Sequence, residues 1–204
     1  MSKKPIIVFE GIEGSGKSHH ISVVSKYLNK KNISYLKIRE PGGNPNSEKI
    51  RKLILNKKSN FNRNTDLLLY LAARSENIEI IKKNYKKKII LIDRFIDSTI
   101  AYQHYGFGVN LKIIYKINDF LLKNFKPDFT FLHTVNIPNM FLRLKKRRSI
   151  NRYDKFDKIF YNKVQKGFLK LYQKNKNKYK IIDSNKDIQV NKNLILDKID
   201  LLIK

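Results

Sequence analysis

The sequence predicts an α/β fold of three layers, αβα, in which helices surround a five-stranded parallel sheet. Five short apolar runs alternate along the chain with longer segments of helical spacing, which is the order that successive βαβ units give. The runs are apolar at consecutive positions, as in Ile6-Ile7-Val8-Phe9 and Ile89-Ile90-Leu91-Ile92. Such runs fit strands that are buried on both faces, as strands of a parallel sheet are.

The expected elements follow from these runs and from helical periodicity. Strands are expected at Pro5–Glu10, Ser34–Arg39, Lys88–Asp93, Asp128–Thr134 and Lys178–Asp183. Helices are expected at Lys17–Lys31, Thr65–Tyr85, Asp97–Tyr105, Lys112–Asn124, Asn139–Arg148 and Lys158–Asn175, with a last one from about Gln189. In the second helix Leu67, Leu71, Arg74, Ile78 and Ile81 keep a helical spacing. Without repeats or a Pro/Gly/Ser-rich linker, residues 1–204 are expected to form one domain.

Composition excludes several classes of protein. The chain has no cysteine, so disulfide frameworks and zinc–thiolate sites are excluded. Its first residues, Met1–Pro5, are too short and polar for a signal peptide, and no apolar stretch is as long as a membrane span. The expected location is therefore the cytoplasm, with no membrane partner.

The charge of the chain is strongly positive. Lys and Arg number 44 against 17 Asp and Glu, a formal net charge of +27. Lysine and asparagine are spread along the whole chain, as in YLNKKN and YQKNKNKYK, so a biased composition explains the charge better than a binding arm. A nucleic-acid-binding protein remains the alternative class, but no zinc module or RNA-binding aromatic motif supports it. We therefore expect no specific nucleic-acid partner.

A phosphate-binding loop follows the first strand. The segment GIEGSGKS matches G-x-x-x-x-G-K-[ST] and lies between a predicted strand and a predicted helix, as in the P-loop NTPase fold. Its backbone amides and the start of the helix can bind phosphate, while the lysine reaches the β- and γ-phosphates and the serine hydroxyl can bind Mg²⁺. The expected ATP-binding residues are Gly11, Ile12, Glu13, Gly14, Ser15, Gly16, Lys17 and Ser18.

Four longer motifs distinguish among the classes of P-loop enzyme. FEGIEGSGKS, IREPGG, LLLYLAAR and DRFIDSTIAYQ, followed by NRYD and IID, together resemble thymidylate kinases over nearly the whole chain. The resemblance implies ATP-dependent phosphorylation of dTMP to dTDP in dTTP synthesis, by direct in-line transfer between bound nucleotides, with Mg²⁺ as cofactor and a homodimeric assembly. Another mono- or deoxynucleoside kinase remains the alternative enzyme.

The resemblance also assigns the acceptor site. It implies that Arg94 holds the dTMP phosphate, that the ring of Tyr70 stacks on thymine, and that Arg74 donates to a base carbonyl. Arg74 interrupts an apolar helical row, and a buried arginine needs a partner, which a ligand would provide. Tyr102 is expected either to exclude a 2′-hydroxyl or simply to pack, and Asp97 to cap a short helix. The expected dTMP-binding residues are Glu13, Arg39, Glu40, Arg51, Tyr70, Arg74, Arg94, Thr99, Tyr102 and Gln103.

The remaining catalytic charge is expected from a lid. Thymidylate kinases supply this charge either from an additional basic residue inside the P-loop or from a lid. Because the P-loop here has no cation besides Lys17, the resemblance implies that a small mobile lid at about residues 143–154 supplies it. By the resemblance of NRYD to the family's lid segment this cation is Arg152, while Arg147 and Arg148 stay open as alternatives, as does a merely solvated basic stretch. The expected catalytic residues are Lys17, Asp93, Arg94 and Arg152, and the expected metal ligands are Ser18 and Asp93.

Overall fold

A five-stranded parallel sheet forms the centre of the computed structural model, which describes residues 4–123, 125–147 and 151–204. The strands are β1 (Ile6–Gly11), β2 (Tyr35–Arg39), β3 (Ile89–Asp93), β4 (Phe129–Thr134) and β5 (Tyr179–Asp183), in the spatial order β2-β3-β1-β4-β5. β1 is central, so that Val8 pairs with Ile92 of β3 on one side and with Thr130 of β4 on the other. The predicted fold class is confirmed, and every strand boundary lies within one residue of the expected one.

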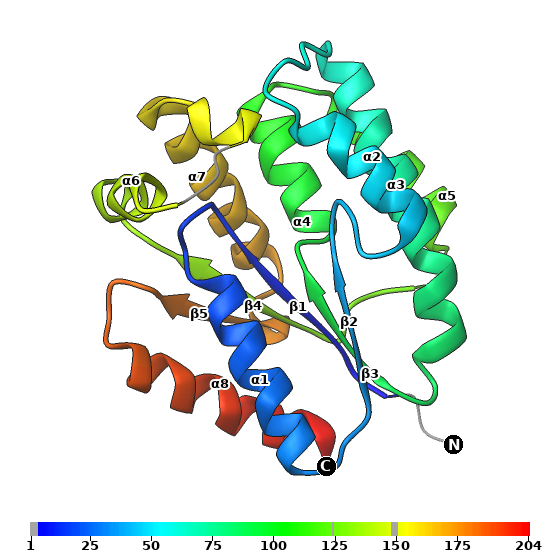
Figure 1. Cartoon of the computed structure of the whole chain (residues 1–204), viewed down its shortest axis with the longest axis vertical. Coiled ribbons are helices and arrows are strands. Elements are labelled where there is room, and N and C mark those ends of the chain that lie inside the picture. The colour runs from blue at the N-terminus through cyan, green and yellow to red at the C-terminus, as the bar shows by residue number, and fades with distance from the viewer. Residues whose placement is uncertain (1–3, 124, 148–150) are drawn as a thin grey trace.

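Helices cover both faces of the sheet (Figure 1). They are α1 (Lys17–Lys30), α2 (Pro45–Leu55), α3 (Arg63–Asn84), α4 (Ile96–Thr99), α5 (Leu111–Leu122), α6 (Ile137–Lys145), α7 (Lys158–Lys174) and α8 (Ile188–Ile203). A π-helix, η1 (Ile100–Gly106), continues α4, and two 3₁₀ turns are η2 (Arg152–Lys155) and η3 (Lys176–Lys178). None of the helices in the described part of the chain is both long and apolar enough to cross a membrane.

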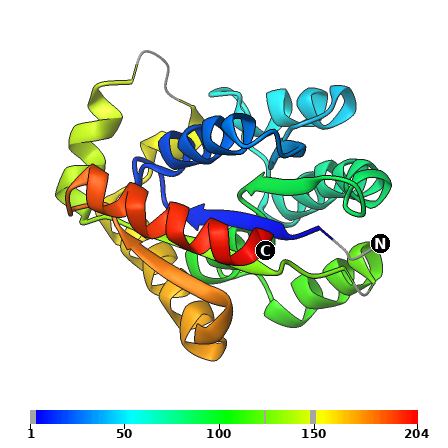
Figure 2. The same cartoon turned by 90° about the horizontal axis from the view of Figure 1, so that it is seen from below.

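The alternation of side chains along β1 divides the core. Ile7 and Phe9 pack with residues of α1 and α8, which lie next to each other on one side of the sheet (Figures 1 and 2). Ile6 and Val8 point to the other side and pack with residues of α3 and the end of α5. This two-sided burial is the reason that the strand was apolar at consecutive positions.

The sequence analysis missed one helix and the character of another. It expected no helix at α2, although Asn44-Pro45 is a helix-start signal: the Asn44 side chain accepts from the amides of Asn46 and Ser47, and Pro45 occupies the first turn. The segment expected as one helix over Asp97–Tyr105 is α4 followed by the π-helix, in which the Phe107 amide donates to the Tyr102 carbonyl, five residues back.

Two glycines bring η1 and α7 into close contact. A Cβ at Gly167 would lie 2.5 Å from the ring of Tyr105, and one at Gly106 would lie 2.8 Å from the ring of Phe160. This packing fixes η1, and with it the side chains of Tyr102 and Gln103, against the rest of the molecule.

Candidate active site

A cavity of about 230 Å³ opens at the carboxyl ends of the strands, where ligands of open parallel sheets bind. All of the expected dTMP-binding residues line it, together with Lys17, Ser18 and Asp93 of the expected donor and metal sites. The other residues of its lining, which the sequence analysis did not name for this site, include Pro41, Leu55, Phe95, Ser98, Asn151 and Tyr153. Residues from six separate segments thus meet at one place.

The P-loop is held by its glycines and by Lys17. Gly11 has a φ of 134° and lies so close to β4 that a Cβ would come within 2.2 Å of the His133 carbonyl oxygen. The Lys17 ammonium donates to the carbonyl oxygens of Gly11 at 2.9 Å and Ile12 at 2.8 Å. Burial and the neighbouring Arg94 lower the pKa of Lys17 to about 7, so an anionic phosphate beside it would restore its charge.

The P-loop is also anchored to α6 and to the residue that follows β5. The guanidinium of Arg143, on α6, donates to the Gly14 carbonyl at 2.9 Å and to the Ser184 carbonyl at 2.7 Å. The Ser184 hydroxyl in turn donates to the Ser15 carbonyl at 2.5 Å. The loop after β5 and the start of the lid region therefore both support the phosphate-binding backbone.

Arg94 connects the P-loop with the aromatic ring of Tyr102. It donates to the Gly11 carbonyl at 2.9 Å and to Glu13 Oε1 at 2.9 Å, and its guanidinium lies 5.2 Å from the centre of the Tyr102 ring. The Tyr102 hydroxyl donates to the other carboxylate oxygen of Glu13. Burial alone would raise the pKa of Glu13, but the charges of Arg94 and Lys17 outweigh it and lower that pKa. Glu13 is thus an anion that fixes both Arg94 and Tyr102.

Arg74 is buried, with 1% of its surface exposed, and is paired within the protein. Its guanidinium donates twice to Glu40 Oε2, at 2.8 and 2.7 Å. The same guanidinium also donates to Thr99 Oγ1 at 2.9 Å and to Asn118 Oδ1 at 2.6 Å. The sequence analysis expected a ligand to be this partner, whereas the protein supplies it. Among the described residues that line the cavity, the buried polar side-chain atoms without a hydrogen-bond partner are Glu40 Oε1 and the amide oxygen and nitrogen of Gln103.

The Pro-Gly-Gly turn after β2 is fixed by two residues that the sequence analysis missed. Glu48 Oε1 accepts from Arg39 at 2.9 Å and from the Gly43 amide at 2.9 Å. Asn77, one turn after Arg74 on α3, donates to the Gly42 carbonyl at 2.8 Å. Asn77 lies among apolar residues in its helical row, and this position could have predicted that its polar side chain is buried. Arg51 also donates to this turn, at the Pro41 carbonyl, over 2.6 Å.

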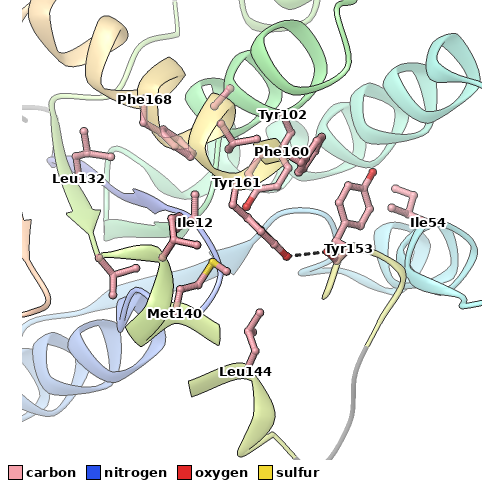
Figure 3. Close-up of a cluster of buried hydrophobic side chains, with 14 residues drawn as sticks. Ile12, Ile54, Tyr102, Leu132, Met140, Leu144, Tyr153, Phe160, Tyr161 and Phe168 are labelled. Carbon is pink, nitrogen blue, oxygen red and sulfur yellow. Dashed lines mark hydrogen bonds between the residues drawn. The ribbon is translucent and has the colours of Figure 1, made fainter. Parts of the chain in front are cut away.

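The expected lid residues lie apart from one another. Arg152 donates to Asp66 Oδ1 at 2.6 Å and is not part of the cavity lining, whereas Arg147 lines the cavity and pairs with Asp154 at 3.1 Å. Arg148 lies outside the described residues. Among the described residues of the lid, Tyr153 is the most deeply buried, at 3% exposed, and it joins the apolar cluster of Ile54, Met140 and Tyr161 (Figure 3).

Tyr153 also forms a wall of the acceptor part of the cavity. Its ring packs edge-on against Tyr70 at 6.1 Å and against Tyr102 at 6.0 Å between centroids. Tyr161 donates to the Tyr153 carbonyl at 2.7 Å, drawn as a dashed line in Figure 3. Three aromatic rings from α3, η1 and η2 therefore enclose the space beside Arg74 and Gln103.

The expected cap of α4 is wrong. Asp97 makes no capping bond; its carboxylate accepts from the Tyr179 hydroxyl at 2.8 Å, and burial raises its pKa to about 6. The amides at the start of α4 instead donate to Glu10, the residue before the P-loop, which the sequence analysis treated only as part of a strand.

Comparisons with known proteins agree with one another. A family model described as thymidylate kinase matches residues 9–195. A thymidylate kinase of Clostridium novyi is 37% identical over 193 residues, covering 92% of this chain and 94% of its own. One of Mycoplasma capricolum is 39% identical over 187 residues, covering 89% and 88%. The crystal structure of thymidylate kinase from Ehrlichia chaffeensis superposes with a TM-score of 0.77 at 31% identity, covering 98% of this chain and 99% of that one.

The buried pair of Arg74 and Glu40 gives a prediction for stability. Glu40→Gln leaves the Arg74 guanidinium without its anionic partner, and breaking a buried ion pair in this way costs about 3–5 kcal/mol. Chemical denaturation of the variant should show this loss. Glu79→Gln removes a carboxylate from an exposed pair with Lys82 on the same helix and should cost about 0–1 kcal/mol. Equal stability of the two variants would contradict the prediction.

Proposed function

The chain belongs to the thymidylate kinase family, and from this membership we propose how its cavity transfers a phosphoryl group from ATP to dTMP. The enzyme phosphorylates dTMP to dTDP with ATP as the donor. One observation carries the assignment of the site: a single cavity extends from the P-loop residues Lys17 and Ser18 to the buried base-sized space beside Tyr70.

The donor phosphates bind at the P-loop. The residues from Gly11 to Ser18 would hold ATP, with backbone amides turned toward the phosphates by the positive φ angles of Gly14 and Gly16. Lys17 would exchange its two carbonyl partners for β- and γ-phosphate oxygens. A lysine that is buried and has a lowered pKa gains most from such an anion, which supports this role.

The acceptor phosphate binds at Arg94. Its planar guanidinium suits phosphate oxygens, and its bonds to Gly11 and Glu13 fix it between the two nucleotides. Arg39 and Arg51, on the same cavity wall, would add charge on the acceptor side. The phosphate oxygen of dTMP is itself the nucleophile, so the transfer needs positioning and charge neutralisation rather than a side-chain base.

Thymine binds among the rings and the buried polar groups. Tyr70 would stack on the base, while Arg74, Thr99 and Gln103 would provide donors and acceptors to its edge. The unpartnered amide of Gln103 and the free oxygen of Glu40 support this assignment, because buried polar atoms normally find partners. Tyr102, held by Glu13, would lie under the sugar and exclude a 2′-hydroxyl.

Mg²⁺ fits the donor end of the cavity. Ser18 and Asp93 both line it, and a hydroxyl and a carboxylate are the hard oxygen donors that this ion prefers. In the part of the chain that the structure describes, no cluster of three His, Cys, Asp or Glu side chains could hold a metal alone. That agrees with a magnesium ion that takes its other ligands from phosphates and water. When bound, the ion would neutralise charge on the phosphates.

The lid would complete the charge around the transferred group. We assign this role to residues 143–154 and, within them, to Arg152, which would exchange Asp66 for the nucleotide phosphates. Arg147 is the alternative, supported by its place on the cavity wall. The protein as a whole would then be a single domain, residues 1–204, with this one small moving part.

Family membership also leads us to propose a homodimer in the cytoplasm. Exposed apolar side chains on the neighbouring helices α3 and α5 support the dimer; among them Phe120 is 77% exposed and Leu68 56%. A monomeric mass by light scattering at micromolar concentration would contradict the dimer, and recovery with the membrane fraction would contradict the location.

The acceptor is tested by a direct assay. The purified protein with ATP and Mg²⁺ should phosphorylate dTMP far faster than dUMP, dCMP or dGMP, because among these bases only thymine fills the space enclosed by the three rings. Thymidine should also be a poor acceptor, because it lacks the phosphate that attacks ATP. Lys17→Ala should abolish transfer to every acceptor. Brisk turnover of another acceptor with little of dTMP would overturn the proposed function, and activity of Lys17→Ala would remove the P-loop from the mechanism.

The lid assignment is tested by a matched pair of variants. Arg152→Ala should lower kcat at saturating substrates by about 1,000-fold or more, the scale of an arginine that stabilises charge on a transferring phosphoryl group. Arg147→Ala should have a smaller effect. Asp66→Asn, which releases Arg152 from its ion pair, should leave kcat at least at its original value. A larger loss in Arg147→Ala would transfer the role to Arg147.

A further inference from the structure

Glu10 makes a set of buried contacts that the proposed mechanism does not use. It lies on β1, directly before the P-loop, and is 1% exposed. Its Oε1 accepts from the Phe95 amide at 2.8 Å and from the Ser98 amide at 3.2 Å. Its Oε2 accepts from the Ser98 hydroxyl at 2.5 Å. One carboxylate thus binds every donor offered by Phe95 and Ser98 at the beginning of α4.

These contacts replace an ordinary helix cap. The N-cap residue of α4 is Phe95, which has no side-chain oxygen and makes no capping bond. The amides at the start of a helix need an acceptor, and they favour a negatively charged one. Glu10 meets this need from a neighbouring strand, so the position of α4 depends on it.

The residue in front of this helix is Arg94. Its φ is 65°, in the left-handed region, where a residue with a side chain is held only if its surroundings fix it. The amide of Phe95 belongs to the peptide bond that follows Arg94, and it donates to the Glu10 carboxylate. On the other side the Arg94 amide donates to the Phe9 carbonyl at 3.0 Å. The unusual backbone of Arg94 is therefore clamped on both sides by β1.

Ser98 extends the clamp to the guanidinium. Its hydroxyl donates its proton to Glu10, so its oxygen is left to accept, and Arg94 Nη1 donates to it at 3.3 Å. The direction of both bonds follows from the carboxylate, which can only accept. Glu10 thereby orients both the backbone and the side chain of Arg94 without reaching the cavity itself.

We propose that Glu10 is a positioning residue for phosphoryl transfer, whose carboxylate holds Arg94 aimed at the phosphate of dTMP. The inference rests on the proposed role of Arg94. Glu10 touches no substrate and exchanges no proton with one. Its contribution is to keep the arginine in the strained conformation from which the guanidinium reaches both phosphates.

The surroundings of Glu10 make its charge sensitive to pH. Burial raises its pKa to about 7, and the neighbouring Asp97 adds to this, while the Ser98 and Phe95 bonds and the charge of Arg94 oppose it. Lys17 and Tyr179 are the other titratable groups whose pKa values respond to its charge. The carboxylate that clamps α4 is present above this pKa and is lost as the pH falls below it.

Glu10→Gln tests the proposal with the full-length enzyme. If the amide nitrogen faced the two backbone amides, a donor would meet donors; if it faced Ser98, it would donate to the hydroxyl oxygen and leave the hydroxyl proton without its acceptor. In both orientations the negative charge at the start of α4 is lost. We expect kcat/KM for dTMP to fall at least tenfold, while the Kd of ATP, measured by calorimetry, stays within twofold. The ratio of wild-type to variant kcat/KM should shrink as the pH falls below 7, and because this is a ratio, titration of the nucleotides cancels.

A double-mutant cycle separates positioning from a general loss of structure. In an Arg94→Lys background, Glu10→Gln should lower the residual kcat/KM less than twofold, because no guanidinium remains to be oriented. Equal losses in both backgrounds would overturn the proposal. Asp97→Asn is the matched control: it neutralises a buried carboxyl on α4 that accepts from the Tyr179 hydroxyl, whereas the Phe95 and Ser98 donors bind Glu10, and it should retain kcat/KM within twofold.

Ser98→Ala keeps the inference testable if Glu10→Gln does not fold. It removes the hydroxyl that relays Glu10 to Arg94 but leaves both backbone bonds, and it should lower kcat/KM three- to tenfold in the wild-type background and less than twofold with Arg94→Lys. An additive cycle would overturn the proposal. The activity of the wild-type enzyme separates failure of the proposed function from failure of this inference. No dTMP turnover by the wild type contradicts the proposed function, whereas normal dTMP turnover by both the wild type and Glu10→Gln contradicts only this inference.

Discussion

The carbonyl oxygen of Gly11 is the point on which the rest of the site depends, because it accepts hydrogen bonds from both Lys17 and Arg94. In the proposed mechanism Lys17 serves the donor and Arg94 the acceptor, so a single peptide group at the end of β1 holds both residues in place before the nucleotides bind. The close approach of β4 to Gly11 leaves no room for a side chain there. Because β1 is the central strand of the sheet, this peptide group is held more firmly than a loop would hold it.

The arginines around this point are paired before a ligand arrives. Arg94 with Glu13, Arg74 with Glu40, and Arg39 with Glu48 are ion pairs of 2.7–2.9 Å. The chain has 17 acidic residues against 44 basic ones, yet each of these three arginines has a carboxylate as its partner. The pairing orients each guanidinium and lowers the cost of burying it. The net charge of the chain and the charge of its cavity are thus different quantities.

Much of the fold and site followed from the sequence because the signals were local. Apolar runs, consecutive in β1 and β3 and interrupted in β2 and β5, predicted each strand to within one residue, and the order of strand, glycine-rich loop and helix predicted where phosphate would bind. The partners of the buried groups were not accessible in this way. Glu40 and Arg74 are separated by 34 positions, Asp66 and Arg152 by 86, and Glu10 and Ser98 by 88, and no periodic pattern connects residues across such separations. Those contacts exist only once the strands are placed side by side, which is also why the cap of α4 was assigned to the adjacent Asp97 and not to Glu10.

The π-helix η1 has a consequence for how this segment can vary among homologues. Each residue of an α-helix turns the chain by about 100°, and a π-helical turn contains about one residue more than an α-helical one. Removing one residue from η1 would let α4 continue as a regular α-helix, but it would rotate the residues after the deletion by about 100° and separate Gly106 from Phe160. Insertions and deletions in this segment should therefore be rejected, as should a side chain at Gly106.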